Sequence, residues 1–133
     1  MKDKIFIDTS ILLYLYDLDN EKKRKAKEIL KSNYCLSTQV LNEFSNVSIK
    51  KIKLNYKELD ENLKKIIEKT TVFVLTEETI LSAVKIQHRY KFQYYDSLII
   101  ATALENGCNV LYSEDMQHNQ LIENRLTIIN PFE

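Results

Sequence analysis

The chain has 133 residues, with nineteen lysine and arginine residues, nineteen aspartate and glutamate residues and one glycine. This length suits one domain, and 44% hydrophobic with 29% charged residues is an ordinary globular composition, which excludes a disordered chain. The single glycine, Gly107, excludes the P-loop, the dinucleotide-binding fingerprint, the nucleophile elbow and the kinase loop, because each needs two or more glycines at fixed spacing.

The first half of the chain alternates short apolar runs with helical patterns. A buried strand is predicted at residues 5–7, followed by a polar turn whose hydroxyl residues would cap the next helix. Asp19 or Asn20 can cap a second helix over about 21–32. Three more elements are predicted: a strand at 34–36, a helix that follows Ser37 and Thr38, and an amphipathic helix opened by a capping box at 55–58.

The second half continues this alternation. A strand is predicted at 71–75, and Thr76 can cap a helix that runs to about Tyr90. A helix over about 96–106 ends at Gly107, which suits the left-handed position after a helix. The last strands are predicted at 110–112 and 126–129. Short apolar strands that alternate with helices predict one α/β domain over residues 1–133 with a mostly parallel sheet.

The cysteines, the histidines and the start of the chain bear on compartment and metal chemistry. Cys35 and Cys108 belong to no C-x-x-C pair and are expected to be small buried hydrophobic residues. No signal-peptide pattern precedes the first strand, so a reducing, cytoplasmic setting is expected. No apolar run approaches the ~18 residues of a membrane span. His88 and His118 fit no zinc-binding pattern.

The net charge of zero hides an asymmetry between the two halves. Residues 1–70 hold fifteen basic and eleven acidic side chains, whereas residues 71–133 hold four and eight. Basic stretches of this kind can follow a phosphate backbone, and a solvated helix face is the alternative interpretation. The candidate RNA-binding residues are Lys22, Lys23, Arg24, Lys25, Lys50, Lys51 and Lys53.

Four acidic residues stand where an α/β fold is expected to carry its chemistry. Asp8 follows the first strand and Asp115 follows the strand at 110–112, and open α/β sheets place their sites at the carboxyl ends of strands. Glu43 and Asp96 lie in otherwise apolar helical turns, where a carboxylate is either paired or faces a cleft. The sequence therefore makes these four acids the candidate site.

Each acid also has a simpler interpretation. Asp8 could cap the helix after it, and Asp96 could be a cap or a first-turn residue. Glu43 could pair with Lys50, and Asp115 could belong to a turn. The equivalent positions of the acids at the sheet end, with no cation beside them in sequence, favour convergence instead.

Converging carboxylates need compensating charge. Two of them about 4 Å apart repel by roughly 4 kcal/mol at an effective dielectric constant near 20. Hard divalent ions such as Mg²⁺ take oxygen ligands and keep waters and substrate phosphates. The expected chemistry is in-line attack of a metal-activated water on a phosphodiester, with the hydroxyl groups of Thr9, Ser10 and Ser113 orienting carboxylates or water.

Four segments in order resemble the PIN-domain nucleases, and their order, spacing and chain length are closest to the VapC-type toxin ribonucleases. The segments are Ile5–Ser10, Leu41–Phe44, Tyr95–Ala103 and Leu111–Met116, and the resemblance covers essentially the whole chain. It implies a PIN-like parallel sheet of about four to five strands sandwiched by helices and an acidic pocket that binds Mg²⁺ or Mn²⁺. It also implies endonucleolytic RNA cleavage, a homodimer and inhibition by a cognate antitoxin.

The resemblance assigns roles to individual residues. Those that match the acidic quartet of the family are Asp8, Glu43, Asp96 and Asp115. Thr9 or Ser10, together with Ser113, match the accompanying hydroxyl positions. Glu114 is adjacent to the last acid, so its side chain is expected to point elsewhere. Asn119 stands where relatives often carry glycine, and asparagine tolerates a positive φ.

Two other function classes remain open from the sequence. A phosphohydrolase with an aspartyl nucleophile would use Asp17 and Asp19, but that class expects a strand before the D-x-D pattern, and the preceding run here reads as helix. A non-catalytic α/β module that binds RNA or protein through its basic helices is the second alternative. A degenerate acidic quartet would favour that module, and no acid of the quartet is missing.

Overall fold

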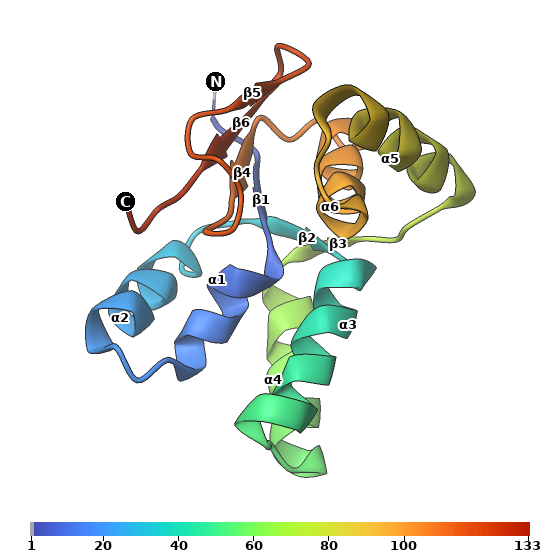
Figure 1. The fold of residues 1–133 in the computed structure, drawn as a ribbon. Helices are drawn as coiled ribbons and strands as arrows, with labels where there is room; N and C mark the ends of the chain where they lie inside the picture. Colours follow the sequence, from blue (N-terminus) through green and yellow to red (C-terminus); the bar gives the residue numbers. More distant parts are fainter. Residues whose placement is uncertain (1) are drawn as a thin grey trace.

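A sheet in the order β3-β2-β1-β4-β6-β5 forms the centre of the fold (Figure 1). A computed structural model describes residues 2–133. The six strands are β1 (Ile5–Ile7), β2 (Cys35–Ser37), β3 (Thr71–Phe73), β4 (Val110–Tyr112), β5 (Leu121–Ile122) and β6 (Leu126–Ile129). All neighbours in this sheet are parallel except β5 and β6, which are antiparallel.

The helices that flank the sheet begin at the caps that their sequences favour. Asp19 caps α2 and Thr76 caps α5, while Asn55 and Glu58 form the capping box of α4. The helices are α1 (Thr9–Leu13), α2 (Asn20–Ile29), α3 (Thr38–Val47), α4 (Tyr56–Lys69), α5 (Glu77–Tyr90) and α6 (Tyr94–Glu105), with a 3₁₀ turn at Tyr14–Tyr16 and a π-helical turn at Ser48–Ile52.

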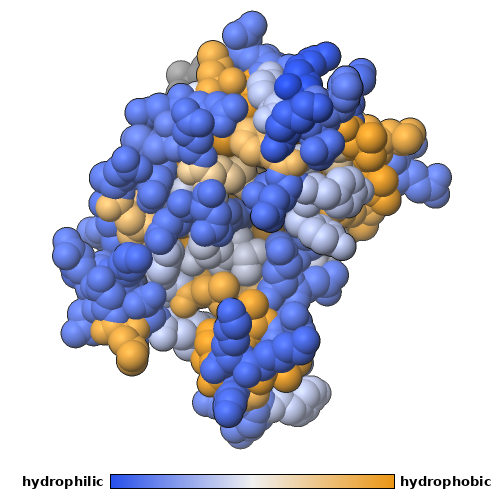
Figure 2. All heavy atoms as spheres, in the orientation of Figure 1, coloured by the Kyte–Doolittle hydropathy of each residue, from blue (hydrophilic) through white to orange (hydrophobic). Residues whose placement is uncertain are grey.

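The core lies on both faces of the central strands. Phe6 and Ile7 of β1 are fully buried, as is Leu111 of the neighbouring strand β4. Helix α6 is buried from Ser97 to Leu104, which agrees with its apolar sequence on all sides. Helix α5 packs against α6 and leaves apolar side chains on the surface at Ile80, Leu81 and Val84, and Figure 2 shows hydrophobic surface over this part of the molecule.

The sequence predictions hold for the fold class and differ in local detail. The sheet has six strands rather than four or five, because the two-residue strand β5 is too short to leave a pattern. The first helix is capped by Asp8 and not by the hydroxyl residues after it. Gly107 takes the predicted left-handed conformation with a φ of 73°, and both cysteines are buried and free. Among residues 2–133, no helix is both long and apolar enough to cross a membrane.

The order of the strands decides where a site can form. The chain runs from β1 outward through β2 to β3, then returns to place β4 on the other side of β1. The strand order therefore reverses between β1 and β4, and ligands of open α/β sheets bind outside the carboxyl ends of the strands at this point. Asp8 and Ser113 are the first residues after these two strands.

Candidate active site

Asp8 lies at the carboxyl end of the central strand and is only 3% exposed. Its Oδ1 accepts hydrogen bonds from the Ser10 backbone N–H at 2.8 Å and from the Ser10 hydroxyl at 2.5 Å. Its Oδ2 accepts one from the Ser113 hydroxyl at 2.5 Å. Burial raises the pKa of Asp8 to about 6 in spite of these bonds, and the nearby charge of Asp115 adds to the rise. Asp8 thus caps α1, and its burial disfavours its charged form.

Asp115 reaches the same edge from β4. The parallel pairing of Ile7 with Tyr112 places the end of β4 beside the end of β1, and the Asp8 N–H donates to the Tyr112 carbonyl at 3.1 Å. The Asp115 N–H donates to the buried Ser113 hydroxyl oxygen at 3.2 Å. Asp115 itself lies in an exposed bend, as the turn interpretation expected. The Ser113 hydroxyl group therefore connects Asp8 and Asp115.

Glu43 projects from α3, which Ser37 caps at the end of β2. Its Oε1 accepts from the Thr9 hydroxyl at 3.0 Å and from Gln39 Nε2 at 3.4 Å. Burial raises the pKa of Glu43, and the charges of Asp96 and Asp115 raise it further, while the Thr9 and Gln39 bonds oppose the rise. No ion pair joins Glu43 to Lys50, so the alternative interpretation of Glu43 is wrong.

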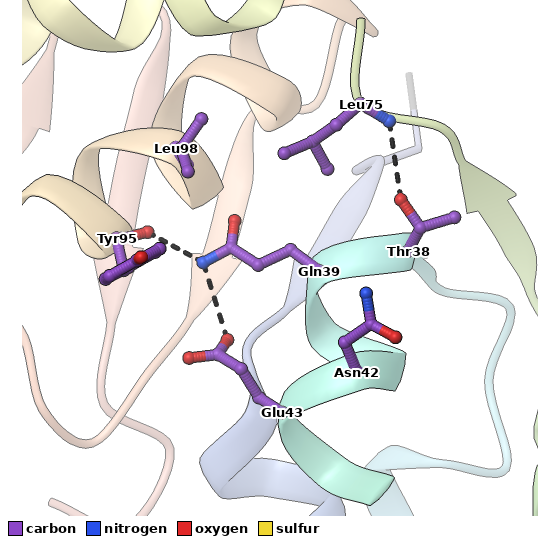
Figure 3. A pocket seen from close by; sticks show the side chains of 7 residues that line it. All are labelled: Thr38, Gln39, Asn42, Glu43, Leu75, Tyr95 and Leu98. Carbon is purple, nitrogen blue, oxygen red and sulfur yellow. Dashed lines mark hydrogen bonds between the residues drawn. The ribbon is translucent and has the colours of Figure 1, made fainter. Parts of the chain in front are cut away.

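Asp96 lies in the first turn of α6, where Gln93 and not Asp96 is the N-cap. Burial raises the pKa of Asp96, and the charge of Asp115 adds to this. Helix α6 is held against α3 by Gln39, whose Nε2 donates to the Tyr95 carbonyl at 2.9 Å (Figure 3). Gln39 therefore fixes the turn of α6 that carries Asp96 beside the turn of α3 that carries Glu43.

The four predicted acids lie within electrostatic reach of one another at the carboxyl edge of the sheet, since each raises or responds to the pKa of another. Within residues 2–133, none of the four forms a salt bridge with a lysine, arginine or histidine. This is a group of carboxylates with uncompensated negative charge. Carboxylates grouped in this way are stabilised either by a bound cation or by protons.

The oxygen atoms of these four carboxylates suit a hydrated divalent cation, but they do not surround one ion completely. Carboxylate oxygens are the ligands that Mg²⁺ and Mn²⁺ prefer. In the part of the chain that the structure describes, no three histidine, cysteine or acidic side chains approach closely enough to hold one ion together. Mg²⁺ commonly takes one or two carboxylates directly and keeps several waters, which is compatible with this spacing.

The Glu114 carboxylate makes its contacts outside the four acids, although burial and, to a smaller extent, the charge of Asp115 raise its pKa. Its carboxylate accepts a hydrogen bond from the Tyr14 hydroxyl and lies 3.5 Å from Lys22 Nζ. Lys22 Nζ also lies 4.9 Å from the centre of the Tyr14 ring. One candidate RNA-binding lysine is therefore fixed beside the loop that carries Asp115.

Sequence reasoning missed Gln39, Tyr14 and the pairing of Lys22. Gln39 precedes Glu43 by one helical turn, and this i,i+4 spacing was the available signal. The Tyr14 contact with Glu114 joins residues a hundred positions apart and leaves no local signal.

Asn119 has the predicted positive φ, at 68°. Asp19 is a helix cap that follows a 3₁₀ turn, so the strand that an aspartyl phosphohydrolase needs is missing before it.

The protein is therefore of the α/β class. Its sheet is parallel except for β5, and acidic side chains without a cationic partner lie near the carboxyl ends of β1 and β4, where the strand order reverses. The PIN domain family model matches residues 5–123, and the chain belongs to the PIN domain family. Comparison with curated protein sequences finds no significant match.

Solved structures with a similar fold include proteins described as toxins or as toxin–antitoxin complexes. A toxin–antitoxin complex from Klebsiella pneumoniae has a TM-score of 0.74 at 18% identity, with 98% of this chain and 99% of that chain covered. VapC20 of Mycobacterium tuberculosis, described as a toxin that cleaves the sarcin-ricin loop, has a TM-score of 0.68 at 18% identity over 84% of this chain and 90% of its own. DNA-bound VapBC from Salmonella typhimurium has a TM-score of 0.61 at 17% identity, with 96% and 97% covered.

Proposed function

We propose that the protein is a metal-dependent endoribonuclease that hydrolyses RNA phosphodiester bonds, and that it is the toxin of a toxin–antitoxin pair. The observation that carries this proposal is the gathering of Asp8, Glu43, Asp96 and Asp115 at one edge of the sheet without a cationic partner. Membership of the PIN domain family supports nuclease chemistry.

Each residue has a definable part in this reaction. Asp8, Asp96 and Asp115 would hold Mg²⁺ or Mn²⁺, which when bound supplies an activated water and stabilises charge on the phosphate oxygens. Glu43 joins them through its free oxygen, because its Oε1 already accepts from Thr9 and Gln39. Ser10 and Ser113 direct the two oxygens of Asp8, and this limits the rotation of its carboxylate.

The proposal is tested by incubating the purified protein with RNA in Mg²⁺, in Mn²⁺ and in excess chelator. We expect cleavage only with a divalent metal, and we expect Asp8→Asn and Asp96→Asn to stop it. The matched control is Asp60→Asn, since Asp60 pairs with Lys64 on the surface of α4. Equal cleavage by the wild type and the two site variants, or cleavage in chelator, would refute the proposal. RNA binding without cleavage under every metal would favour a non-catalytic binding module.

An antitoxin is the proposed protein partner. Three of the similar structures are described as a toxin–antitoxin complex or as VapBC bound to DNA, and these descriptions apply to those proteins. We propose that a cognate antitoxin covers the acidic edge of this chain and blocks cleavage. A small protein encoded beside this gene should inhibit the purified enzyme, and inhibition should fail if the acidic edge stays open to RNA in the complex.

A second copy of this chain is the proposed partner of α5. Ile80, Leu81 and Val84 are 45%, 73% and 54% exposed on this helix, and a homodimer would bury them. Leu81→Glu should convert the dimer to a monomer in light scattering. Leu18→Glu, at a side chain that is 98% exposed between helices, should leave the dimer intact. A wild type that is monomeric at all concentrations would refute the homodimer.

A further inference from the structure

A pocket of about 480 Å³ opens between α3 and the start of α6, directly beside Glu43 (Figure 3). Glu43 forms one wall, so the pocket adjoins one of the four acids of the candidate site. Its volume lies within the range of sites that bind small organic groups. The remaining walls carry both polar and apolar side chains: Thr38, Gln39, Asn42, Leu75, Tyr95 and Leu98.

Gln39 leaves one hydrogen-bonding atom without a partner in this pocket. The residue is 9% exposed, and its Nε2 donates to the Tyr95 carbonyl and to Glu43. These two bonds fix the orientation of the amide, so the buried Oε1 points between Leu98 and Leu75 (Figure 3). Among the described residues no donor reaches Oε1. A buried acceptor without a partner costs free energy, which a ligand with an N–H group would recover.

The other walls fit a flat, neutral ring. The Tyr95 side chain is 65% exposed and offers an aromatic face, while Leu75 and Leu98 supply apolar contacts. Asn42 adds a solvent-exposed amide at the rim. The carboxylate of Glu43 disfavours a phosphate or another anion in the same space. Unpaired nucleobases combine an aromatic face with N–H donors on their edge, and proteins bind them by stacking and hydrogen bonding.

We propose that this pocket binds one unpaired nucleobase of the RNA, next to the phosphate that is cleaved. The base stacks on Tyr95 and donates from an N–H group on its edge to Gln39 Oε1. Adenine, cytosine and guanine can donate from an exocyclic amino group and uracil can donate from its N3–H, so the pocket accepts an unpaired base of any of the four kinds and disfavours a base without an N–H donor on that edge, such as purine. This inference rests on the proposed ribonuclease function and adds the specificity of the same site.

The first test measures binding without cleavage. A single-stranded oligonucleotide that contains one 2-aminopurine is titrated with the protein in excess chelator, and stacking on a tyrosine quenches the fluorescence of this base. We expect quenching by the wild type and by Tyr95→Phe, and roughly tenfold weaker binding by Tyr95→Leu. Tyr56→Leu is the matched control, because Tyr56 is 83% exposed on α4. Equal quenching by Tyr95→Leu and the wild type, or no quenching at all, would overturn the proposal.

The second test compares two RNAs that carry either adenine or purine, which lacks the amino group of adenine, next to the cut. The wild type should cut beside adenine about tenfold more often than beside purine, and Gln39→Leu should lose this preference whatever its overall rate. A ratio that is unchanged in Gln39→Leu would overturn the base pocket while the ribonuclease proposal stands. If no RNA is cleaved with any metal, the ribonuclease proposal fails, and the binding test still decides whether the pocket takes a base. If an antitoxin peptide and not the oligonucleotide depends on Tyr95, the pocket is a protein-binding site and the nucleobase proposal is wrong.

Discussion

Ser113 and Asp8 are joined by a hydrogen bond of 2.5 Å from the serine Oγ to the aspartate Oδ2, and this bond ties the ends of β4 and β1 together. The same Oγ accepts the N–H of Asp115 at 3.2 Å. One buried hydroxyl group thus sets the orientation of one acid and the backbone position of another. It does so at the point of the sheet where the strand order reverses.

Ser113→Ala should therefore weaken both the fold and the site. The change leaves Oδ2 of Asp8 buried without its donor, so we expect the free energy of unfolding to fall by about 1–3 kcal/mol. We expect cleavage to fall by about 10- to 100-fold, because groups that orient metal ligands have effects of this size. Denaturant unfolding and RNA cleavage measure the two effects.

Ser48→Ala is the matched control for this change. Ser48 is also fully buried, but its Oγ has no hydrogen-bond partner among the described residues. Removing that hydroxyl group should leave stability unchanged or increase it. Equal losses of stability in the two variants would show that the bond from Ser113 to Asp8 has no special role.

Because the pKa of Asp8 is raised, the stability of the metal-free protein should depend on pH. Burial raises this pKa from 3.8 to about 6, so the folded state binds the proton more tightly than the unfolded state. The contribution of Asp8 to the free energy of unfolding should then be fully present below about pH 4 and should fall by at most about 3 kcal/mol as the pH rises through 6. The raised pKa values of Glu43 and Asp96 act in the same direction.

Asp8→Asn isolates this effect, because asparagine does not titrate. Unfolding of the wild type and of Asp8→Asn is measured in chelator between about pH 4 and pH 7.5. The variant should gain stability relative to the wild type as the pH rises through 6. A difference between the two proteins that stays constant over this range would contradict a raised pKa at Asp8.

The fold and the positions of the four candidate acids could be predicted from local pattern, whereas the contacts around these acids could not. Asp8 and Asp115 follow apolar runs that end abruptly, and the rule that parallel strands carry sites at their carboxyl ends brings the two together. Glu43 and Asp96 stand out as acids inside apolar turns. The prediction of these four positions required only the expected strand ends and the helical spacing.

The supporting contacts depend on tertiary packing. Gln39 donates to a carbonyl group 56 residues away, and Glu114 accepts from Tyr14 at a separation of 100 residues. Neither pair has a periodic signature, because each joins two helices or a helix and a loop through single side chains. Strand β5 was missed for a related reason, since its two residues pair only with β6.

Divalent cations should reverse the pH dependence and stabilise the protein. A cation held by ionised carboxylates binds the folded state, and at a hundred times its Kd it adds about 2.7 kcal/mol to the free energy of unfolding. The melting temperature at pH 7.5 should rise with Mg²⁺ or Mn²⁺ and return to its starting value after chelation. Asp96→Asn should reduce this rise and Asp60→Asn should not. An equal rise in all three proteins would place the cation elsewhere.

The basic residues of α2 should set the salt dependence of RNA binding. Each phosphate contact to a single strand contributes about 0.7 to the slope of log K against log salt. Neutralising Lys22, Lys23 and Lys25 together should lower that slope by roughly 1.4 to 2, with the smaller value expected because Lys22 already lies 3.5 Å from Glu114. The affinity of Asp8→Asn for single-stranded RNA, measured at several salt concentrations, provides the slope without cleavage.

The control is a variant that loses three lysine charges from another helix, α4. Lys57, Lys64 and Lys65 belong to α4, and their neutralisation changes the net charge by the same amount. If α2 contacts phosphate directly, only the α2 variant loses slope, because counterion release depends on close contacts and not on total charge. Equal changes in both variants would mean that the RNA responds to the overall field of the protein, and α2 would then be a solvated helix face.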